Sequence, residues 1–463
     1  MKPKRYYIET YGCEMNKSDS VDIALTFQAR GYEESASGDD ADVVVLNTCS
    51  VREHAAERII GRLGYYRSTN RKREGELLVV LAGCMAQEQG RRVMELFPEI
   101  KVVTGTYHGL RIAEAVQQYG ETGNPVVLLD REHYDFSSFR GQRAQGHSAW
   151  VNIIVGCSNF CSYCIVPHLR GPERSKPSHE VIEEVRQLAE RGVVQVTLLG
   201  QNVNAYGKDS GDMGFVELLT QINEIEGIKW IRFLTSHPRD FDEEIVRLLA
   251  GLEKVCRHIH LPLQSGSDRI LKLMNRQYDT HHFCSMVDAI RTHMPDASIT
   301  TDLIVGFPAE KEEDFRMTLD LVRRVWFDDA FTYRYSARPF TEALRLEDTV
   351  DRETAGHRLD ELIEVQRGLS LQKNRQEIGK TVVALVEGQS KKNVREMLCR
   401  TGQNRMVVVC TDEPAGGFLN IQIEEVSGNT LRGVELGKAG HSYITDAACF
   451  AGSGMASEES GRT

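Results

Sequence analysis

Short apolar runs alternate with longer amphipathic stretches over the first part of the chain. Apolar runs occupy residues 6–10, 43–47, 77–82 and 102–104, and ten or more residues with helical periodicity follow each of them. Such alternation of strands and helices is typical of an open parallel α/β sheet. We therefore predict an N-terminal α/β domain over residues 1–120.

The same rhythm restarts after a stretch without sustained periodicity. Residues 121–147 mix Gly, Pro and Ser with charged side chains, which is typical of a linker. Beyond it, six strand-like runs predict a partial (β/α)6 barrel over residues 148–375, with its site at the carboxyl ends of the strands. These runs are residues 151–155, 194–199, 230–234, 258–261, 299–305 and 330–335.

The C-terminal part of the chain has a different pattern of residues. Between residues 376 and 445, β-branched runs are separated by Gly, which predicts a small all-β barrel. Residues 446–463 are rich in Gly, Ser and Glu, and we expect this tail to be disordered. The expected strands of the small barrel are residues 381–387, 406–410, 418–426 and 430–434.

Composition narrows the class of protein. Of 463 residues, 27% are charged and 41% are hydrophobic, as in soluble globular proteins. The apolar run 77–85 is far shorter than the roughly 18 residues of a membrane-spanning helix, and residues 1–8 lead into no apolar signal region. We expect a cytoplasmic protein without a membrane segment. Eleven cysteines are too sparse for a disulfide scaffold, so their thiols are available as metal ligands.

The clearest chemical motif is a group of three cysteines within eight residues. Cys157, Cys161 and Cys164 form a C-x3-C-x2-C loop directly after an apolar run. Iron–sulfur clusters require several closely placed thiolates. Three thiolates on a four-iron cluster leave one iron without a protein ligand, and an open coordination position distinguishes a reactive metal site from a structural one. We therefore expect that iron to bind a substrate.

A second set of three cysteines is dispersed along the chain. Cys13, Cys49 and Cys84 each follow one of the first three expected strands, at intervals of 36 and 35 residues. Ligands of open α/β sheets gather outside the carboxyl ends of the strands, so these three loops can converge on one cluster. Coincidental spacing is the alternative, and the other five cysteines receive no role.

The loop at Cys157 resembles the signature of the radical S-adenosylmethionine (SAM) enzymes. The resemblance implies that the open iron of a [4Fe–4S] cluster binds SAM and cleaves it to a 5′-deoxyadenosyl radical. It also places Tyr163 near the adenine of the cofactor, with ordinary loop packing as the alternative. Polar loops after later strands are expected to hold the rest of SAM, although Gly306 also suits a simple turn. These candidates are Gly200, Gln201, Gln264, Ser265 and Gly306.

The whole arrangement resembles the methylthiotransferase family over residues 5–445, and its tRNA branch fits best. That branch methylthiolates N6-dimethylallyladenosine at position 37 of tRNA, beside the anticodon. The resemblance implies two [4Fe–4S] clusters and two SAM molecules, with the set at Cys13 holding the cluster that carries the sulfur, and no separate acid or base. It implies tRNA, a flavodoxin-type electron donor and a sulfur donor as partners, and we expect a monomer. The motifs that carry it are Tyr11-Gly-Cys-Glu-Met-Asn16, Asn47-Thr-Cys-Ser-Val-Arg-Glu53, Leu199-Gly-Gln-Asn-Val-Asn-Ala-Tyr206, Thr235-Ser-His-Pro238, Leu263-Gln-Ser-Gly-Ser-Asp-Arg269 and Asp302-Leu-Ile-Val-Gly-Phe-Pro308.

Two alternatives remain open at this point. A sister methylthiotransferase that acts on threonylcarbamoyladenosine in tRNA, or on an aspartate of a ribosomal protein, would share both cysteine sets. A non-catalytic RNA-binding iron–sulfur or zinc protein is the alternative of another class.

The last segment resembles a TRAM domain, a small RNA-binding barrel. Between residues 388 and 411 it carries five basic residues against Glu396 alone, in a chain of net charge −11. A local basic strip is what phosphate contacts require, with a solvated charged face as the alternative. The strip consists of Lys391, Lys392, Arg395, Arg400 and Arg405, and we expect Arg170, Arg174 and Lys176 to extend it toward the barrel mouth.

Overall fold

The computed structural model describes residues 3–50, 53–73, 76–131, 136, 144–391 and 393–439. Lys392, the tail predicted to be disordered at residues 446–463, and most of the second half of the predicted linker lie outside the described residues. No described helix is both long enough and apolar enough to cross a bilayer.

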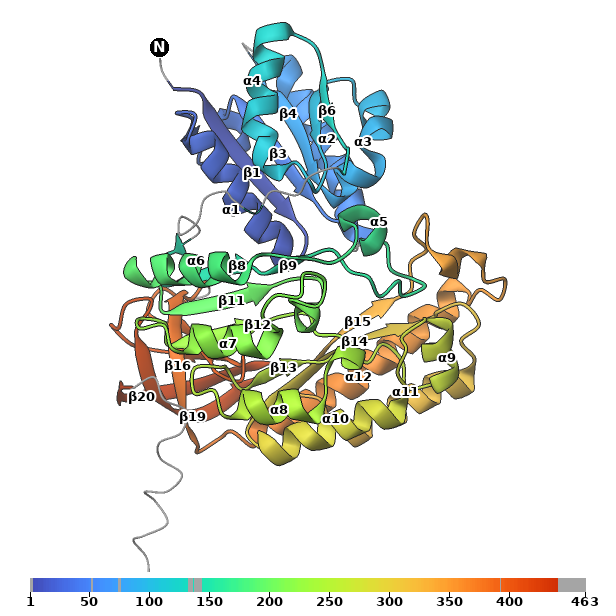
Figure 1. Cartoon of the computed structure of the whole chain (residues 1–463), viewed down its shortest axis with the longest axis vertical. Helices are drawn as coiled ribbons and strands as arrows, with labels where there is room; N and C mark the ends of the chain where they lie inside the picture. Colours follow the sequence, from blue (N-terminus) through green and yellow to red (C-terminus); the bar gives the residue numbers. More distant parts are fainter. Residues whose placement is uncertain are drawn as a thin grey trace, which may run out of the picture.

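The N-terminal part is an open parallel α/β sheet, which confirms the predicted fold class of this region (Figure 1). The strand order is β2-β1-β3-β4-β5-β6, and every neighbouring pair is parallel. The strands are β1 (Arg5–Tyr11), β2 (Glu33–Glu34), β3 (Val43–Thr48), β4 (Leu78–Gly83), β5 (Ile100–Thr104) and β6 (Val126–Leu128). The helices are α1 (Glu14–Gln28), α2 (Glu53–Lys72), α3 (Cys84–Leu96) and α4 (Ile112–Thr122).

Helices cover both faces of this sheet, which explains its continuous apolar strands. Val43 and Val45 of β3 pack with residues of α1 and α4, whereas Val44 and Leu46 pack with residues of α2 and α3. Every residue of β3 is buried. A strand buried on both faces carries apolar side chains without alternation, as the run 43–47 does.

Strand β6 lies within the segment that the sequence assigns to a linker. Val126 pairs with Val102 and Leu128 pairs with Thr104, so residues 126–128 extend the N-terminal sheet. The three-residue strand follows Pro125 and is too short to show periodicity in the sequence.

The middle of the chain forms the predicted partial barrel of six parallel strands. Strands β8, β11 and β12 form one parallel group and β13, β14 and β15 another, and an isolated bridge between Ile231 and Val255 links them. These strands are β8 (Ser148–Asn152), β11 (Gln195–Leu199), β12 (Trp230–Phe233), β13 (His258–His260), β14 (Ser298–Val305) and β15 (Asp329–Arg334). Three short strands are added to them: β7 (Ala144–Gln145), which pairs with β8, and the antiparallel pair of β9 (Ile154–Val155) and β10 (Arg174–Ser175).

Amphipathic helices cover the outside of this partial barrel. In α11, for example, Phe315, Leu319 and Val322 follow helical spacing and pack into the same core as Ile259 and Leu303. The helices are α5 (Val166–Arg170), α6 (Ser178–Glu190), α7 (Phe215–Asn223), α8 (Glu243–Ala250), α9 (Asp268–Leu273), α10 (Thr280–His293), α11 (Glu312–Val325) and α12 (Arg352–Arg375).

The C-terminal segment is a small closed β-barrel, as predicted, with the strand order β16-β17-β18-β20-β19. The sequence analysis missed β17, because its Cys399-Arg400-Thr401 segment was interpreted only as part of a basic strip. The strands are β16 (Thr381–Gln389), β17 (Met397–Thr401), β18 (Met406–Val409), β19 (Phe418–Ser427) and β20 (Thr430–Lys438).

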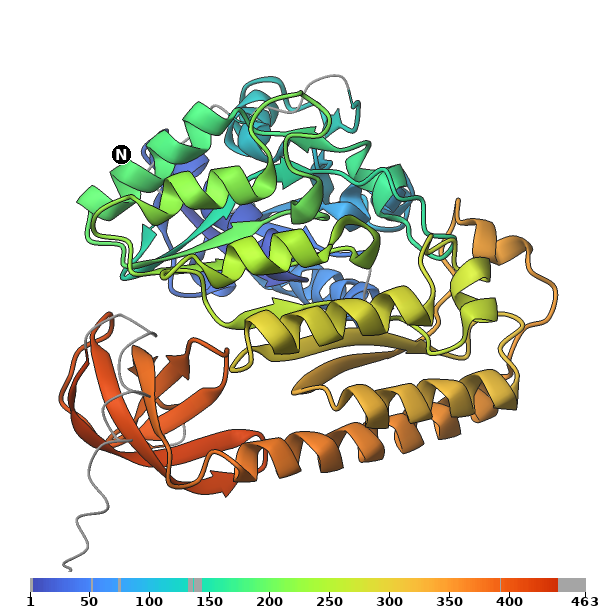
Figure 2. The same cartoon turned by 60° about the horizontal axis from the view of Figure 1, so that its bottom comes forward.

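This small barrel packs against the amino-terminal ends of the larger barrel's strands (Figure 2). Ser298, the first residue of β14, donates a 2.6 Å hydrogen bond to the carbonyl of Gln403. Trp230, the first residue of β12, packs edge-on against Phe418 with ring centroids 5.0 Å apart. The small barrel therefore lies at the opposite end from the carboxyl ends of the strands.

Candidate metal centre

The dispersed cysteines lie at one edge of the N-terminal sheet. Strands β1, β3 and β4 are adjacent and parallel, and Cys13, Cys49 and Cys84 follow their carboxyl ends within two residues. Cys13 precedes α1 directly and Cys84 is the first residue of α3. Cys49 and Cys84 are buried and Cys13 is exposed. The sheet therefore brings together three residues that are about 35 positions apart in sequence.

These three thiols interact with one another and with one cation. A hydrogen bond with Cys49 is the main reason why the pKa of Cys13 falls to about 6, and the positive charge of Arg170 lowers it further. Burial raises the pKa of Cys84, and Arg170 opposes that effect. Cys13 therefore lies near both other thiols, and Arg170 lies near Cys13 and Cys84, which suits a site for a metal cluster.

A pair of buried asparagines fixes two of these loops. Asn16 accepts hydrogen bonds from the backbone and the thiol of Cys13, both at 3.3 Å, and donates to Asn47 and to the carbonyl of Thr48, both at 3.3 Å. Asn47 donates in return to the carbonyl of Asn16 at 2.8 Å. A Cβ atom at Gly12 would lie 2.9 Å from the Cβ of Cys49, so only glycine fits this close approach of the two loops.

The compact cysteine motif forms a loop after β9. The backbone N–H of Cys157 donates to the carbonyl of Gly171 at 3.0 Å, and that of Cys164 donates to the carbonyl of Cys161 at 2.9 Å. Burial is the main reason why the pKa of Cys157 rises to about 11 and that of Cys164 to about 12, and the neighbouring Cys161 contributes to both shifts. These thiols become thiolates when a bound cation replaces their protons, as metal ligands do.

The donor sets fit a cluster better than a single ion. Among the described residues, no three His, Cys, Asp or Glu side chains converge closely enough to hold one metal ion. A four-iron cluster instead distributes its thiolates over different irons. Sets of three thiols that lie near one another without converging on one point suit that larger group.

Helix α5 lies where the N-terminal domain meets the partial barrel (Figure 1). The helix begins two residues after Cys164, and Ile165 and Leu169 form an apolar cluster with Cys84. At its end, Arg170 donates a 2.8 Å hydrogen bond to Asp19 of α1. Helix α5 therefore connects the compact cysteine loop to the dispersed set at the junction of the N-terminal sheet and the partial barrel.

Two predicted SAM contacts touch the compact cysteine loop. The side-chain oxygen of Gln201 accepts a 2.6 Å hydrogen bond from the N–H of Gly156, which precedes Cys157. Tyr163 packs on an apolar cluster that includes Met274 and Phe307, and burial raises its pKa. Gln201 thus supports the loop directly, and Tyr163 anchors it.

The other predicted SAM contacts differ in whether they keep a polar atom that a ligand could bind. Gln264 is buried, and its side-chain oxygen has no hydrogen-bond partner among the described residues, so it retains an acceptor for a bound molecule. The hydroxyl of Ser265 accepts from the N–H of Ser267 at 3.2 Å. Gly200 and Gly306 have structural reasons to be glycine: a Cβ would lie 2.4 Å from a methyl carbon of Ile154 at Gly200 and 2.6 Å from the Cβ of Ala355 at Gly306.

Some residues of the predicted basic strip are exposed, and others form ion pairs within the chain. Lys391 and Arg395 are exposed. Arg400 pairs with Glu387 at 2.5 Å, and Arg405 pairs with Asp328 at 2.7 Å and with Glu377 at 2.6 Å. Arg405 therefore holds the small barrel on the large one, and its charge is compensated within the chain.

The expected extension of this strip toward the barrel mouth is wrong for two of its three residues. Lys176 is buried and pairs with Glu184, and Arg170 is buried and pairs with Asp19. Arg174 is half-buried, with its guanidinium over the ring of Tyr107. In the sequence, closely spaced basic residues look like a surface patch. In the structure, Arg170 and Lys176 instead form ion pairs in the interior.

Two polar residues at the compact cysteine loop are not among the predicted site residues. Arg276 donates to the sulfur of Cys161 at 3.3 Å, and Nε2 of His237 lies 4.0 Å from the same atom. They are 115 and 76 residues away from Cys161, so no local spacing reveals them.

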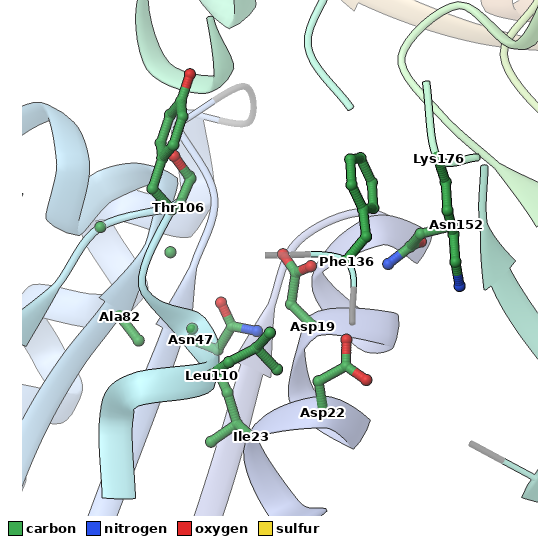
Figure 3. Close-up of a pocket in the computed structure, with 14 residues that line it drawn as sticks. Asp19, Asp22, Ile23, Asn47, Ala82, Thr106, Leu110, Phe136, Asn152 and Lys176 are labelled. Atoms are coloured by element: carbon green, nitrogen blue, oxygen red, sulfur yellow. The ribbon is translucent and has the colours of Figure 1, made fainter. Parts of the chain in front are cut away.

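A small cavity of about 40 Å³ lies beside the dispersed cysteine set (Figure 3). Asn47 and Gly83, which precede Cys49 and Cys84, line it together with Asp22 of α1. The barrel contributes Asn152, which points toward Asp19 and Asp22 in Figure 3. The cavity thus belongs to the same junction of sheet and barrel.

Family models match all three parts of the chain. The Radical SAM superfamily matches residues 151–322, the Uncharacterized protein family UPF0004 matches residues 5–105, and the TRAM domain matches residues 375–435. Among solved structures, the chain resembles the radical S-adenosylmethionine methyltransferase TsrM from Kitasatospora setae, with a TM-score of 0.53 and 14% identity over 74% of this chain and 77% of that one. This similarity supports the fold alone.

Curated relatives match nearly the whole chain. Proteins named tRNA-2-methylthio-N(6)-dimethylallyladenosine synthase are 44% identical over 437 residues in Caldicellulosiruptor saccharolyticus (93% of this chain, 92% of the relative) and 43% identical over 439 residues in Dictyoglomus thermophilum (93% and 100%). The protein of that name from Thermoanaerobacter sp. is 42% identical over 433 residues, which are 92% of each chain. The chain belongs to the family of the tRNA-2-methylthio-N(6)-dimethylallyladenosine synthases, which joins a radical SAM barrel to a UPF0004 domain and a TRAM domain.

Proposed function

We propose that this protein methylthiolates N6-dimethylallyladenosine at position 37 of tRNA, with two [4Fe–4S] clusters and two SAM molecules. One observation supports the proposal: α5 follows the compact cysteine set directly in sequence and packs on Cys84 of the dispersed set, which suits a radical-generating site next to a sulfur-carrying site. The names of the relatives favour this substrate over threonylcarbamoyladenosine and over a ribosomal protein.

The chain supplies two sets of thiolate ligands and their supports. Cys157, Cys161 and Cys164 would hold one cluster, and Cys13, Cys49 and Cys84 the other. When bound, the clusters and SAM supply the radical that activates C2 of the adenine, together with the sulfur and the methyl group.

The polypeptide restricts the geometry of this centre and its access to water. The paired amides of Asn16 and Asn47 hold the loops of Cys13 and Cys49, and Gln201 holds the backbone before Cys157. Cys49 is buried, and Cys84 is buried against α5, so these two ligands are shielded from water. Rigid loops and a water-poor site favour radical chemistry because they prevent side reactions of the intermediate.

The RNA-binding part of the proposal rests on the small barrel. Lys391 and Arg395 are the two described residues of the basic strip that remain exposed, and we assign phosphate contacts to them. A one-electron donor of the flavodoxin type and a sulfur donor complete the proposed partners. The tRNA substrate suits work in the cytoplasm, and a monomer is part of the proposal.

The direct test uses an anticodon stem-loop RNA in two versions, one with N6-dimethylallyladenosine and one with threonylcarbamoyladenosine. Anaerobically reconstituted protein, SAM, dithionite and sulfide are added, and the nucleosides are analysed by mass spectrometry. We expect the 2-methylthio product from the dimethylallyl RNA alone. Product from the threonylcarbamoyl RNA alone would assign the chain to the sister branch. SAM cleavage without product from either RNA would contradict the proposed substrates.

A further inference from the structure

The compact cysteine loop contacts a buried arginine that lies far away in sequence. Arg276 lies between α9 and α10, and only 4% of it is exposed. Its Nη1 donates to the sulfur of Cys161 at 3.3 Å and to the hydroxyl of Tyr163 at 3.4 Å. Its other nitrogens donate to the hydroxyl of Tyr278 at 3.0 Å and to the carbonyl of Pro262 at 3.1 Å.

The charge of this arginine has no carboxylate partner in the part of the chain that the structure describes. Its contacts are a carbonyl, two phenols and the sulfur of Cys161. A buried charge is costly unless an opposite charge compensates for it. Of the groups that Arg276 contacts, Cys161 is the one that becomes an anion when it binds a metal. The guanidinium is therefore positioned for a thiolate at Cys161.

The turn that carries Arg276 is built onto the cysteine loop. Asn275 donates to the carbonyl of Phe160 at 2.9 Å, and the N–H of Ser162 donates to the carbonyl of Met274 at 2.9 Å. Asn275 and Gln277, on either side of Arg276, have left-handed backbones with φ of 54° and 57°. Strained residues persist where the surrounding structure fixes them, and such residues cluster at functional sites.

The three thiols of the loop have unequal surroundings. The sulfur of Cys157 accepts from the neutral amide of Asn159 at 3.4 Å, and that of Cys164 from the backbone of Val166. Cys161 has the arginine and, in addition, the imidazole of His237. Nδ1 of His237 accepts from the N–H of Arg239 at 3.2 Å, so its proton lies on Nε2, which faces the sulfur. Cys161 is thus the ligand with two side-chain donors.

The geometry points to Arg276 as a positioning residue that sets the reduction potential of the cluster site at Cys157, Cys161 and Cys164. Three thiolates on a doubly positive four-iron core leave one net negative charge, and one-electron reduction by an external donor adds a second. A fixed guanidinium beside Cys161 stabilises that added charge, because net charge and hydrogen bonds to the sulfurs tune the potential of such clusters. The inference rests on the radical SAM part of the proposed function and is independent of the RNA substrate.

The test is a potentiometric titration of the full chain, with Cys13, Cys49 and Cys84 replaced by alanine so that one cluster is observed. The reduced cluster is quantified by electron paramagnetic resonance with dithionite as reductant, and the oxidised cluster, which gives no such signal, is obtained as the difference from the total cluster content measured as iron. We expect Arg276→Gln to lower the ratio of reduced to oxidised cluster about tenfold at a fixed potential, which corresponds to about 59 mV for one electron. Arg276→Lys retains the charge and is expected to restore most of this ratio.

A control variant separates the charge at the cysteine loop from charge elsewhere. Arg345→Gln removes an exposed charge that pairs with Glu342 at 2.6 Å. It is expected to keep the parental potential. An unchanged potential in Arg276→Gln at parental iron content would overturn the inference, and so would loss of iron from both Arg276 variants. A potential that falls in Arg276→Gln and is restored in Arg276→Lys, both at parental iron content, would support it. The titration contains no RNA, so a negative result leaves the proposed substrate intact.

Discussion

Arg170 donates a 2.8 Å hydrogen bond to Asp19 and thereby joins α5 of the barrel to α1 of the N-terminal domain. Arg170 is six residues after Cys164, and Asp19 is six residues after Cys13. The ion pair therefore connects the two cysteine sets almost directly. It also places a cation beside Cys13 and Cys84, whose thiols it favours in the deprotonated form.

Replacement of Asp19 by Asn should weaken this junction. Removing one partner of a buried pair typically costs about 3–5 kcal/mol, and we expect about 2–3 kcal/mol because Asp19 is partly exposed. Urea denaturation of the reduced, metal-free protein measures the change. Glu14→Gln breaks the exposed pair with Lys17 and is the matched control, with an expected loss below about 1 kcal/mol. Equal losses in the two variants would show that Arg170 contributes no more than a surface pair.

Gly171 should not tolerate alanine while Tyr107 is present. Its backbone angles of φ 71° and ψ −167° are accessible essentially to glycine alone, and a Cβ would lie 2.0 Å from the hydroxyl oxygen of Tyr107. We expect Gly171→Ala to cost about 1–3 kcal/mol through the backbone and about 1–3 kcal/mol through the overlap. Tyr107→Phe alone should cost about 1 kcal/mol, since its hydroxyl donates to the carbonyl of Arg170 at 3.0 Å.

The double variant tests the contact between these two residues. Phenylalanine removes the overlapping oxygen, and the next ring atom is 3.4 Å from the added Cβ. The loss of stability in Gly171→Ala/Tyr107→Phe should therefore be smaller than the sum of the single losses. Additive losses in urea denaturation would contradict this packing.

Basic residues of the small barrel should fall into two groups in RNA binding. Arg395→Gln should reduce the slope of log K against log salt by about 1, because the residue is exposed and free to neutralise a phosphate. Arg405→Gln should leave the slope unchanged and lower thermal stability, because it breaks the pairs with Asp328 and Glu377. Fluorescence anisotropy of a labelled stem-loop at several salt concentrations measures the slope. A reduced slope for Arg405→Gln alone would reverse this assignment.

Asp314 should make stability depend on pH near the loop of Gln264. Burial alone would raise its pKa, but hydrogen bonds from Arg269, Ser267 and the N–H of Lys311 outweigh this effect and hold the pKa below its usual range. A carboxylate with a lowered pKa contributes stability that is complete above its unfolded-state pKa and is lost as the pH falls through the folded-state value.

The matched variant isolates this contribution. Asp314→Asn should be less stable than the parent at pH 6, and the difference should shrink as the pH falls from about 5 toward about 3. Urea denaturation at each pH measures it. A difference that stays constant or grows on acidification would show that the charge of Asp314 is not what stabilises the loop.

Patterns of hydrophobic residues and cysteine spacing were sufficient to predict the architecture and the two cysteine sets. Strand β3 is apolar at almost every position because helices cover both of its faces, and Cys49 follows that strand directly. Strand β6 was missed because three residues carry no periodicity. Local patterns reveal neighbours in the chain, so the adjacency of Cys13, Cys49 and Cys84 followed from a rule about parallel sheets.

The positions of charged residues in the sequence predicted the structure less well than the hydrophobic pattern did. Lys176, Arg170 and Arg405 occupy basic stretches, yet each has a carboxylate partner that is distant in sequence. Arg276 carried no signal at all, because its partner Cys161 is 115 residues away. The burial of a charged side chain depends on tertiary neighbours, which sequence spacing does not disclose.

The central claim is that this chain holds two separate clusters, and iron and sulfide content tests it most directly. Wild-type protein is reconstituted anaerobically beside a triple Ala variant of Cys157, Cys161 and Cys164 and another of Cys13, Cys49 and Cys84, and 5′-deoxyadenosine release is assayed in parallel. We predict about eight irons per wild-type chain and about four in each variant, with release abolished only when the compact set is removed. About four irons in wild type and none after loss of the compact set would contradict the claim, because the dispersed cysteines would then hold no cluster.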